Sequence, residues 1–439
     1  MDMRPKANGV VLVLRELAER RNVRGVNSFR LIGRLLVITS LVVAGCGSSS
    51  NPSNPSNNAA AEAGVKEADA GVKEEAGPSA PDAGGEFAPD AAPVDTTAIP
   101  NLPANTWQYV PIQGAMCRDG SPTGIGVNVN PGSKNLMIYL EGGGACFNAL
   151  TCATNPATFG MTEFTTRFGG TAGDQGVFSR TDTANAMADW NFVYIPFCTG
   201  DVHAGNKLDA TVPGVTGKQQ FVGYANVTRD LARIIPTFPG LDKVLLTGVS
   251  AGGFGAAANY PQTAKAFGSV PVYSLDDSGP PMADPYASSC LQAQWAQTWG
   301  FDKTVLADCG SDCKDPTNYT IDATMHTAKM YPKIPFGIVD DTDDGVITLF
   351  YGFGAGMCTA LIPTQLTADT FTAGLLDSRM RLAALPNVGG FIFQGMVHTT
   401  LGGASFDTRT AGSGDAATVK LTDWVATLVN SGTVTNVGP

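Results

Sequence analysis

Short, continuous apolar runs separated by glycine-, proline- and aspartate-rich loops constrain the fold of this chain most strongly. Runs of four to six residues are typical of strands that are buried on both faces of a parallel sheet. The candidate strands are Asn135–Leu140, Phe192–Phe197, Val244–Thr247, Val270–Leu275, Ile334–Val339 and Gly390–Phe393. Helical patterns lie between or after them, at Gln219–Ile235, Gly253–Phe267 and Ala416–Val429. Strands that alternate with helices predict a doubly wound, mostly parallel α/β sheet in a three-layer sandwich, as a single domain over residues 98–439.

The N-terminal segment has the features of an export signal. An apolar run from Leu35 to Gly45 follows Arg30 and Arg34, and at about a dozen residues it is too short to span a bilayer but suits a signal-peptide core. The ending Val43-Ala-Gly-Cys46 resembles the lipobox of bacterial lipoproteins. We therefore expect residues 1–45 to be a lipoprotein signal peptide and Cys46 to carry the lipid that attaches the protein to a membrane.

Residues 46–97 differ in composition from everything after them. They are rich in Ala, Gly, Ser, Asn, Pro and Glu, and Phe87 is their one aromatic residue. Such a segment cannot bury enough apolar surface to fold. We predict a disordered tether between the anchor and the folded domain.

Eight of the nine cysteines lie after residue 98, an even number. In an exported protein this predicts up to four disulfides, and the short spacings favour local bridges between Cys146 and Cys152 and between Cys309 and Cys313. A zinc site is less favoured, because the chain has no CxxC motif and three histidines. The eight are Cys117, Cys146, Cys152, Cys198, Cys290, Cys309, Cys313 and Cys358.

The charge balance bears on the partners of the chain. The formal net charge is −11, and no basic patch with interleaved aromatic residues offsets it. A protein of this kind repels the phosphate backbone, so we expect no nucleic-acid partner.

A GxSxG motif lies between a predicted strand and a predicted helix. The segment Val244–Phe254 reads as an apolar strand, then Gly-Val-Ser250-Ala-Gly, then a helical pattern. In this context the motif describes a nucleophile elbow, where small neighbours allow the strained turn that exposes the serine hydroxyl. Ser250 is the candidate nucleophile, and the sheet is predicted to be α/β-hydrolase-like.

A glycine run follows the first predicted strand. Gly142, Gly143 and Gly144 come directly after Asn135–Leu140 and Glu141. Backbone N–H groups of such a loop can stabilise an oxyanion near the serine. Gly143, Gly144 and the N–H of Ala251 are the predicted oxyanion hole.

The general base should be a histidine that follows the serine in the chain, by the order serine, acid, histidine of α/β hydrolases. That order excludes His203 and leaves His326 and His398. His398 is favoured because it follows a late strand, where catalytic residues are displayed.

The acid has several candidates. The strand Ile334–Val339 is followed by Asp340, Asp341, Asp343 and Asp344, which could alternatively bind Ca²⁺. Asp276 and Asp277 form a second group after Val270–Leu275.

These motifs together resemble the pectin acetylesterases and the related Notum carboxylesterases. The segment Leu140–Asn148 (LEGGGACFN) resembles the signature of that family, Cys198–His203 (CTGDVH) resembles a second segment, and Gly248–Gly253 (GVSAGG) resembles its nucleophile motif. The resemblance runs in order from about Trp107 to the last helix, which contains Trp424.

The resemblance implies Ser250 as nucleophile and His398 as base. It places the acid in a D-x-apolar-apolar stretch, which Asp344-Gly-Val-Ile347 matches best. Asp343, one residue away, remains the alternative acid. It places the oxyanion hole at Gly143, Gly144 and Ala251. Here Gly144-Ala145 replaces the aromatic residue that often follows the paired glycines.

The implied reaction is cofactor-free and metal-free ester hydrolysis through an acyl-enzyme. By analogy the substrate is an O-acetyl group on polysaccharide. A long-chain acyl ester, as for Notum, and a catalytically silent carbohydrate-binding module are the alternatives. We expect a monomer at the cell envelope, held by the lipid anchor, or in the secreted fraction.

Overall fold

The computed structural model describes residues 93–169, 171–412 and 418–439. The predicted signal peptide, Cys46 and nearly all of the predicted tether lie outside these residues. In the part of the chain that the structure describes, no helix is long and apolar enough to cross a membrane.

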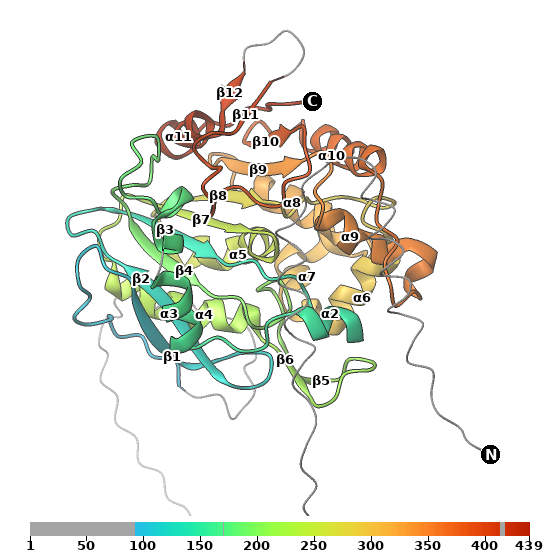
Figure 1. Cartoon of the computed structure of the whole chain (residues 1–439), viewed down its shortest axis with the longest axis horizontal. Coiled ribbons are helices and arrows are strands. Elements are labelled where there is room, and N and C mark those ends of the chain that lie inside the picture. Colours follow the sequence, from blue (N-terminus) through green and yellow to red (C-terminus); the bar gives the residue numbers. More distant parts are fainter. Residues whose placement is uncertain (1–92, 170, 413–417) are drawn as a thin grey trace, which may run out of the picture. The chain divides into compact units, whose positions relative to one another are not determined.

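An eight-stranded sheet forms the centre of the fold (Figure 1), in the order β1-β2-β4-β3-β7-β8-β9-β10. The six strands from β4 to β10 are parallel to one another, whereas β2 is antiparallel to both β1 and β4. Its strands are β1 (Gln108–Met116), β2 (Pro122–Asn128), β3 (Asn135–Leu140), β4 (Asn191–Ile195), β7 (Lys243–Val249), β8 (Val272–Asp277), β9 (Phe336–Asp341) and β10 (Val388–Phe393). This arrangement confirms the predicted mostly parallel α/β sheet.

The alternation of side chains along β3 shows why helices cover both faces of the sheet. Leu136, Ile138 and Leu140 pack in one core cluster with residues of α4 (Gly223–Thr237) and α5 (Ala251–Phe267). Met137 and Tyr139 point to the opposite face, into a cluster that includes residues of α11 (Leu421–Ser431). Both faces are therefore buried, as the continuous apolar runs predicted.

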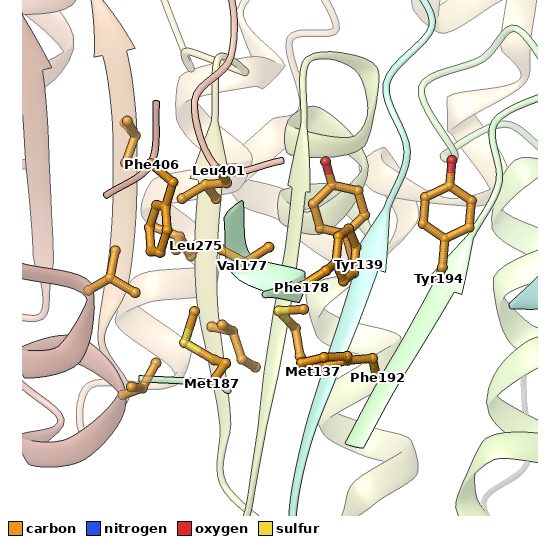
Figure 2. Close-up of a cluster of buried hydrophobic side chains, with 14 of the residues drawn as sticks. Met137, Tyr139, Val177, Phe178, Met187, Phe192, Tyr194, Leu275, Leu401 and Phe406 are labelled. Atoms are coloured by element: carbon orange, nitrogen blue, oxygen red, sulfur yellow. The ribbon is translucent and has the colours of Figure 1, made fainter. Parts of the chain in front are cut away.

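Figure 2 shows part of the second cluster. Phe178 packs against side chains of the neighbouring strands β3 and β4, with its ring 4.7 Å from that of Tyr139 and 6.3 Å from that of Tyr194. The rings of Tyr139 and Tyr194 are stacked 5.9 Å apart. Both tyrosine hydroxyls point toward the same end of their strands (Figure 2). That end is the carboxyl end, where β3 leads into the glycine loop.

The remaining helices form a third core, beside the carboxyl ends of the strands. Its aromatic centre includes Phe147, Trp295, Trp299 and Tyr351, and Figure 1 shows α2, α6, α7 and α9 gathered at one side of the sheet. The helices that contribute to this third core are α2 (Ala149–Thr154), α6 (Ser289–Trp299), α7 (Val305–Cys309), α8 (Tyr319–Met330), α9 (Ile347–Tyr351) and α10 (Ala368–Leu382). Helix α3 (Met161–Phe168) packs instead in the second cluster. Short two-stranded ribbons are made by β5 (Lys207–Ala210) with β6 (Gln219–Phe221), and by β11 (Thr410–Ala411) with β12 (Val419–Lys420).

Two helices begin later in the chain than predicted, and the helix predicted over Gly253–Phe267 begins two residues earlier, at Ala251. Gln219–Phe221 forms strand β6, paired with β5, and the helix begins only at Gly223. The last helix begins at Leu421 rather than Ala416, because residues 419–420 pair with β11; residues 416 and 417 lie outside the described residues. In both cases a neighbouring strand takes the backbone hydrogen bonds that the helix would need.

Four disulfides join the eight cysteines, Cys117–Cys198, Cys146–Cys152, Cys290–Cys358 and Cys309–Cys313. Both predicted local bridges are present.

Candidate active site

Ser250 occupies a sharp turn at the carboxyl end of β7. Its φ of 56° and ψ of −122° lie outside the ordinary regions for a residue with a side chain, and such strain is typical of functional sites. The turn is held because the Ser250 N–H donates to the Asp277 carbonyl (2.7 Å) and the Ser250 carbonyl accepts from Gly253 N–H (2.9 Å). The backbone therefore fixes the serine between strand and helix.

The two glycines of the motif are required by close packing. A Cβ added to Gly248 would lie 2.2 Å from the Gly252 carbonyl oxygen, and one added to Gly252 would lie 2.0 Å from the Leu140 carbonyl oxygen. No side chain fits at either position. The GxSxG spacing therefore reflects the contact of the elbow with the end of β3.

His398 and Asp344 meet in the loops that follow β10 and β9. Nδ1 of His398 lies 2.7 Å from Oδ2 of Asp344. The Asp344 side chain is fully buried, and its Oδ1 accepts the N–H groups of Val346 and Ile347, both at 2.8 Å. This carboxylate is held rigidly and accepts the Nδ1 hydrogen, which leaves Nε2 of His398 as the nitrogen available to take a proton.

The other acidic residues near Asp344 have different surroundings. Both carboxylate oxygens of Asp341 pair with Arg409, at 2.6 and 2.7 Å, and the Asp343 N–H donates to the Gly395 carbonyl. Asp340 is buried, and burial raises the pKa of its carboxyl well above the usual value. Of the two candidates after β9, the structure thus brings Asp344 and not Asp343 to His398.

Asp277, one of the alternative acids, connects the serine turn to the histidine loop. Its Oδ2 accepts the N–H groups of Thr400 and Leu401, each at 2.7 Å, while its backbone carbonyl accepts the Ser250 N–H. Burial raises the pKa of Asp277 to about 6. Sequence reasoning missed this role, and the only available signal was its position at the end of the strand next to β7.

The other two histidines lie in different settings. His326 lies on α8, with Nδ1 3.0 Å from Asp312 Oδ2. His203 is buried, has a positive φ of 59°, and places Nε2 2.8 Å from the Glu141 carbonyl oxygen. His203 therefore contacts the glycine loop, although its position in the chain excluded it as the base.

The glycine loop passes directly beside the serine. A Cβ added to Gly142 would lie 2.6 Å from the Val249 carbonyl oxygen and 3.0 Å from the Ser250 Cβ. One added to Gly144 would lie 3.3 Å from the ring of Phe350, which comes from α9. Ala251 is the first residue of α5, so its N–H has no partner within the helix. Gly143 and Gly144 line the same cavity as Ser250, and Ala251 is the next residue in the chain.

Two cavities that differ in polarity meet at Ser250 and Gly144. The first has a volume of about 90 Å³ and is lined almost wholly by apolar groups, among them Phe254, Ala258, Trp295, Trp299 and Phe350. The second has a volume of about 380 Å³ and contains His398, Thr399, Tyr139, Tyr194, Glu141 and Arg167 in its wall. Ser250 therefore has an apolar side and a polar side.

An ion pair forms one wall of the polar cavity. The Arg167 guanidinium contacts the buried Glu141 carboxylate, which also accepts the Phe197 N–H at 3.0 Å. About half of the Arg167 side chain is exposed. Burial raises the pKa of Glu141, which the positive charge of Arg167 opposes.

Among the described residues, no three His, Cys, Asp or Glu side chains are grouped so that they could hold a metal ion. The Ca²⁺ alternative for the loop after β9 also conflicts with the pairing of both Asp341 oxygens to Arg409.

The sheet, the strained serine between strand and helix, and the histidine and carboxylate on later loops define an α/β-hydrolase-like protein. The sequence model of the Pectinacetylesterase family matches residues 98–335. The chain belongs to this family. The match includes Ser250 and the glycine loop and ends before Asp344 and His398.

Several proteins that are similar in sequence to this chain are named as Notum carboxylesterases. The chain is 29% identical over 172 residues to palmitoleoyl-protein carboxylesterase NOTUM of Mus musculus, which covers 37% of this chain and 33% of the relative. It is 30% identical over 177 residues to notum1a of Danio rerio, with 37% and 33% covered. An inactive relative, notum1b of Danio rerio, is 29% identical over 93 residues, with 20% and 66% covered. The chain thus spans about a third of the length of the first two relatives.

A solved structure shows the same fold. The Wnt deacylase Notum from Drosophila superimposes with a TM-score of 0.52 at 20% identity, covering 74% of this chain and 93% of that chain.

Proposed function

We propose that the chain is a serine carboxylic-ester hydrolase with Ser250 as nucleophile, His398 as base and Asp344 as the acid. The observation that carries this proposal is the strained Ser250 turn in the same cavity as His398, whose Nδ1 lies 2.7 Å from a fully buried carboxylate. A nucleophile, a base and a group that orients the base are the components that acyl transfer requires.

The reaction follows from these positions. The Ser250 hydroxyl attacks the ester carbonyl while Nε2 of His398 takes its proton, and Asp344 stabilises the imidazolium. The N–H groups of Gly143, Gly144 and Ala251 stabilise the oxyanion. His398 returns the proton to the leaving alcohol, and water then releases the acid from Ser250 by the same steps.

The two cavities support a proposal for the two halves of the ester. An engineered apolar cavity of about 150 Å³ holds benzene, so the apolar cavity of about 90 Å³ suits an acyl group of a few carbons. The polar cavity has hydroxyl, carboxylate and guanidinium groups in its wall, which suit a sugar alcohol. We therefore propose removal of short acyl groups, acetyl above all, from polysaccharide.

The long-chain alternative rests on the relatives, which are named as palmitoleoyl-protein carboxylesterases. The apolar lining agrees with it, but the volume favours the shorter acyl group. One relative is named as inactive, and a non-catalytic module is therefore the alternative from another class.

For the location of the protein, four disulfides support export to an oxidising compartment. Attachment through a lipid on Cys46, with residues 46–97 as tether, is part of the proposal and comes from the sequence alone.

The direct test is acetate release from an acetylated polysaccharide and from a chromogenic acetyl ester by the full chain, made under oxidising conditions. Ser250→Ala should lower kcat by about 10⁴-fold or more, while Ser378→Ala, a buried serine of α10 outside both catalytic cavities, should leave kcat within about twofold. A folded protein without ester hydrolysis, or equal activity in Ser250→Ala, would reject the enzyme and favour the binding module.

A further inference from the structure

Two buried side chains from outside the glycine loop contact carbonyl groups in and directly before it. Nδ2 of Asn155 donates to the Gly143 carbonyl oxygen at 2.8 Å. Nε2 of His203 lies 2.8 Å from the Glu141 carbonyl oxygen. Neither residue belongs to the proposed triad or to the proposed oxyanion donors.

Asn155 is itself fixed by its surroundings. It directly follows α2, which the Cys146–Cys152 disulfide joins to the end of the glycine loop. Arg118 donates from Nη2 to the carbonyls of Cys152 (3.1 Å) and Asn155 (3.0 Å). The amide that reaches Gly143 therefore comes from a rigid support.

His203 is fixed in a similar way. Asn259 of α5 donates to its carbonyl at 2.9 Å, and its ring lies 4.9 Å from the ring of Phe197. Burial lowers the pKa of His203 to about 4, so its imidazole is neutral near pH 7. Because the Glu141 carbonyl can only accept a hydrogen bond, Nε2 is the nitrogen that carries the hydrogen.

The planarity of the peptide bond connects these contacts to the oxyanion. In a trans peptide the C=O and N–H groups point in opposite directions. The Gly143 carbonyl and the Gly144 N–H belong to one peptide, so the hydrogen bond from Asn155 directs the Gly144 N–H away from Asn155. The Glu141 carbonyl and the Gly142 N–H belong to another peptide, and the hydrogen bond from His203 fixes its orientation. The peptide between these two joins Gly142 to Gly143 and carries the Gly143 N–H. Its orientation is restricted because the peptides on both sides of it are fixed.

We propose that Asn155 and His203 are positioning residues that aim the Gly143 and Gly144 N–H groups at the oxyanion formed on Ser250. This inference rests on the proposed hydrolase function. A glycine loop has little intrinsic preference for one orientation of its peptides, and oxyanion donors act only when they are preorganised. The two side chains supply that preorganisation from outside the loop.

The test uses kinetics together with a transition-state analogue. A short alkyl boronic acid accepts the Ser250 Oγ at boron, the serine proton passes to His398, and one boron oxygen takes the position of the oxyanion. In the full chain, Asn155→Ala and His203→Leu should each lower kcat for a chromogenic acetyl ester by about 10²-fold, with KM within about threefold. The boronic acid Kd should rise by the same factor as kcat/KM falls.

Two further variants separate positioning from a general loss of structure. His203→Gln keeps a donor near the position of Nε2 and should recover most of the loss seen in His203→Leu. Asn387→Ala removes an amide that donates to the carbonyls of Ala328, Tyr331 and Ile334, outside both catalytic cavities, and should leave kcat and the boronic acid Kd within about twofold.

The inference is overturned if Asn155→Ala or His203→Leu leaves the boronic acid Kd unchanged, or if His203→Gln is no better than His203→Leu. If Asn155→Ala does not fold, the comparison of His203→Leu with His203→Gln tests the inference by itself. A failure of the proposed function would differ, because wild type would then lack Ser250-dependent hydrolysis altogether.

Discussion

The apolar and polar cavities that meet at Ser250 differ in how the chain builds them. The apolar cavity lies between α5 and the helices of the third core, and Trp295, Trp299 and Phe350 belong to its wall. The polar cavity lies at the carboxyl ends of β3 and β4, and Tyr139, Tyr194 and Glu141 belong to its wall. Ser250 thus faces the helices of the third core on one side and the central sheet on the other.

This difference indicates how specificity is divided. Apolar pockets discriminate by size, with each methylene worth about 1–3 kcal/mol, whereas sites built from polar groups discriminate by hydrogen bonding and charge. The smaller cavity should therefore set acyl length, and the larger one should set the chemistry of the alcohol. Ser250, the proposed nucleophile, lines both cavities.

The largest expected effect lies at this shared centre. Asp344→Asn should lower kcat by about 10⁴-fold, because the amide no longer holds His398 in the required tautomer. The loss should be equal for acetyl esters of a chromogenic alcohol and of a sugar, measured by initial rates. If one of the two substrates kept its rate, the two sides would not share a single triad.

A larger side chain in the apolar cavity should affect only the acyl half. Ala258→Phe is expected to lower kcat/KM for butyryl esters by about tenfold to a hundredfold and leave acetyl esters within about threefold. The measurement is kcat/KM for both esters of one alcohol. Ala384→Phe, at an exposed position after α10, is the control and should change neither. Equal losses for both acyl groups would place the acyl chain elsewhere.

A change in the polar cavity should affect only the alcohol half. Arg167→Lys keeps the positive charge beside Glu141 but loses the planar set of donors. We expect about a tenfold fall in kcat/KM for acetyl esters of sugars that carry a carboxylate, and less than about twofold for a chromogenic acetyl ester. Arg381→Lys, in an exposed ion pair with Asp377 on α10, is the matched control. A uniform loss would assign Arg167 to folding rather than to the alcohol.

The smallest effect should come from salt. Raising ionic strength from about 0.05 to 0.5 M shortens the range of electrostatic interactions, so the preference for a carboxylate-bearing sugar ester should weaken by about twofold to threefold. The preference among acyl groups should not weaken, since it depends on apolar contacts. Competition assays with pairs of esters would measure both. An acyl preference that weakened in parallel would mean that the two cavities are not independent.

Much of the fold could be predicted from the sequence, since each strand of the parallel sheet is a short apolar run. Strands β1 and β2 were missed because Pro111, Gln113, Gly124 and Gly126 interrupt their apolar pattern. Helices α6, α7, α9 and α10 were missed, and most of their buried residues face a separate aromatic core rather than the sheet. The segment around His326, which forms part of α8, does have a helical pattern.

The triad candidates could be predicted because each has a local sequence context, a strand followed by a loop. The contacts that support them could not. His203 and Glu141 are 62 residues apart, and Asn155 reaches Gly143 across a disulfide-bonded turn. Such contacts depend on how loops pack, which no local pattern encodes. Of the two carboxylates directly after β9, Asp343 and Asp344, the turn geometry determines which one reaches His398.

The most direct test of the central claim is kcat/KM for a series of esters of one chromogenic alcohol, from acetyl through butyryl and decanoyl to palmitoyl. The full chain should be measured with Ser250→Ala as the background. We predict a maximum at acetyl or butyryl and a fall of at least about tenfold by decanoyl, because the apolar cavity has a volume of only about 90 Å³. A rate that rises toward palmitoyl, or that persists in Ser250→Ala, would contradict the account.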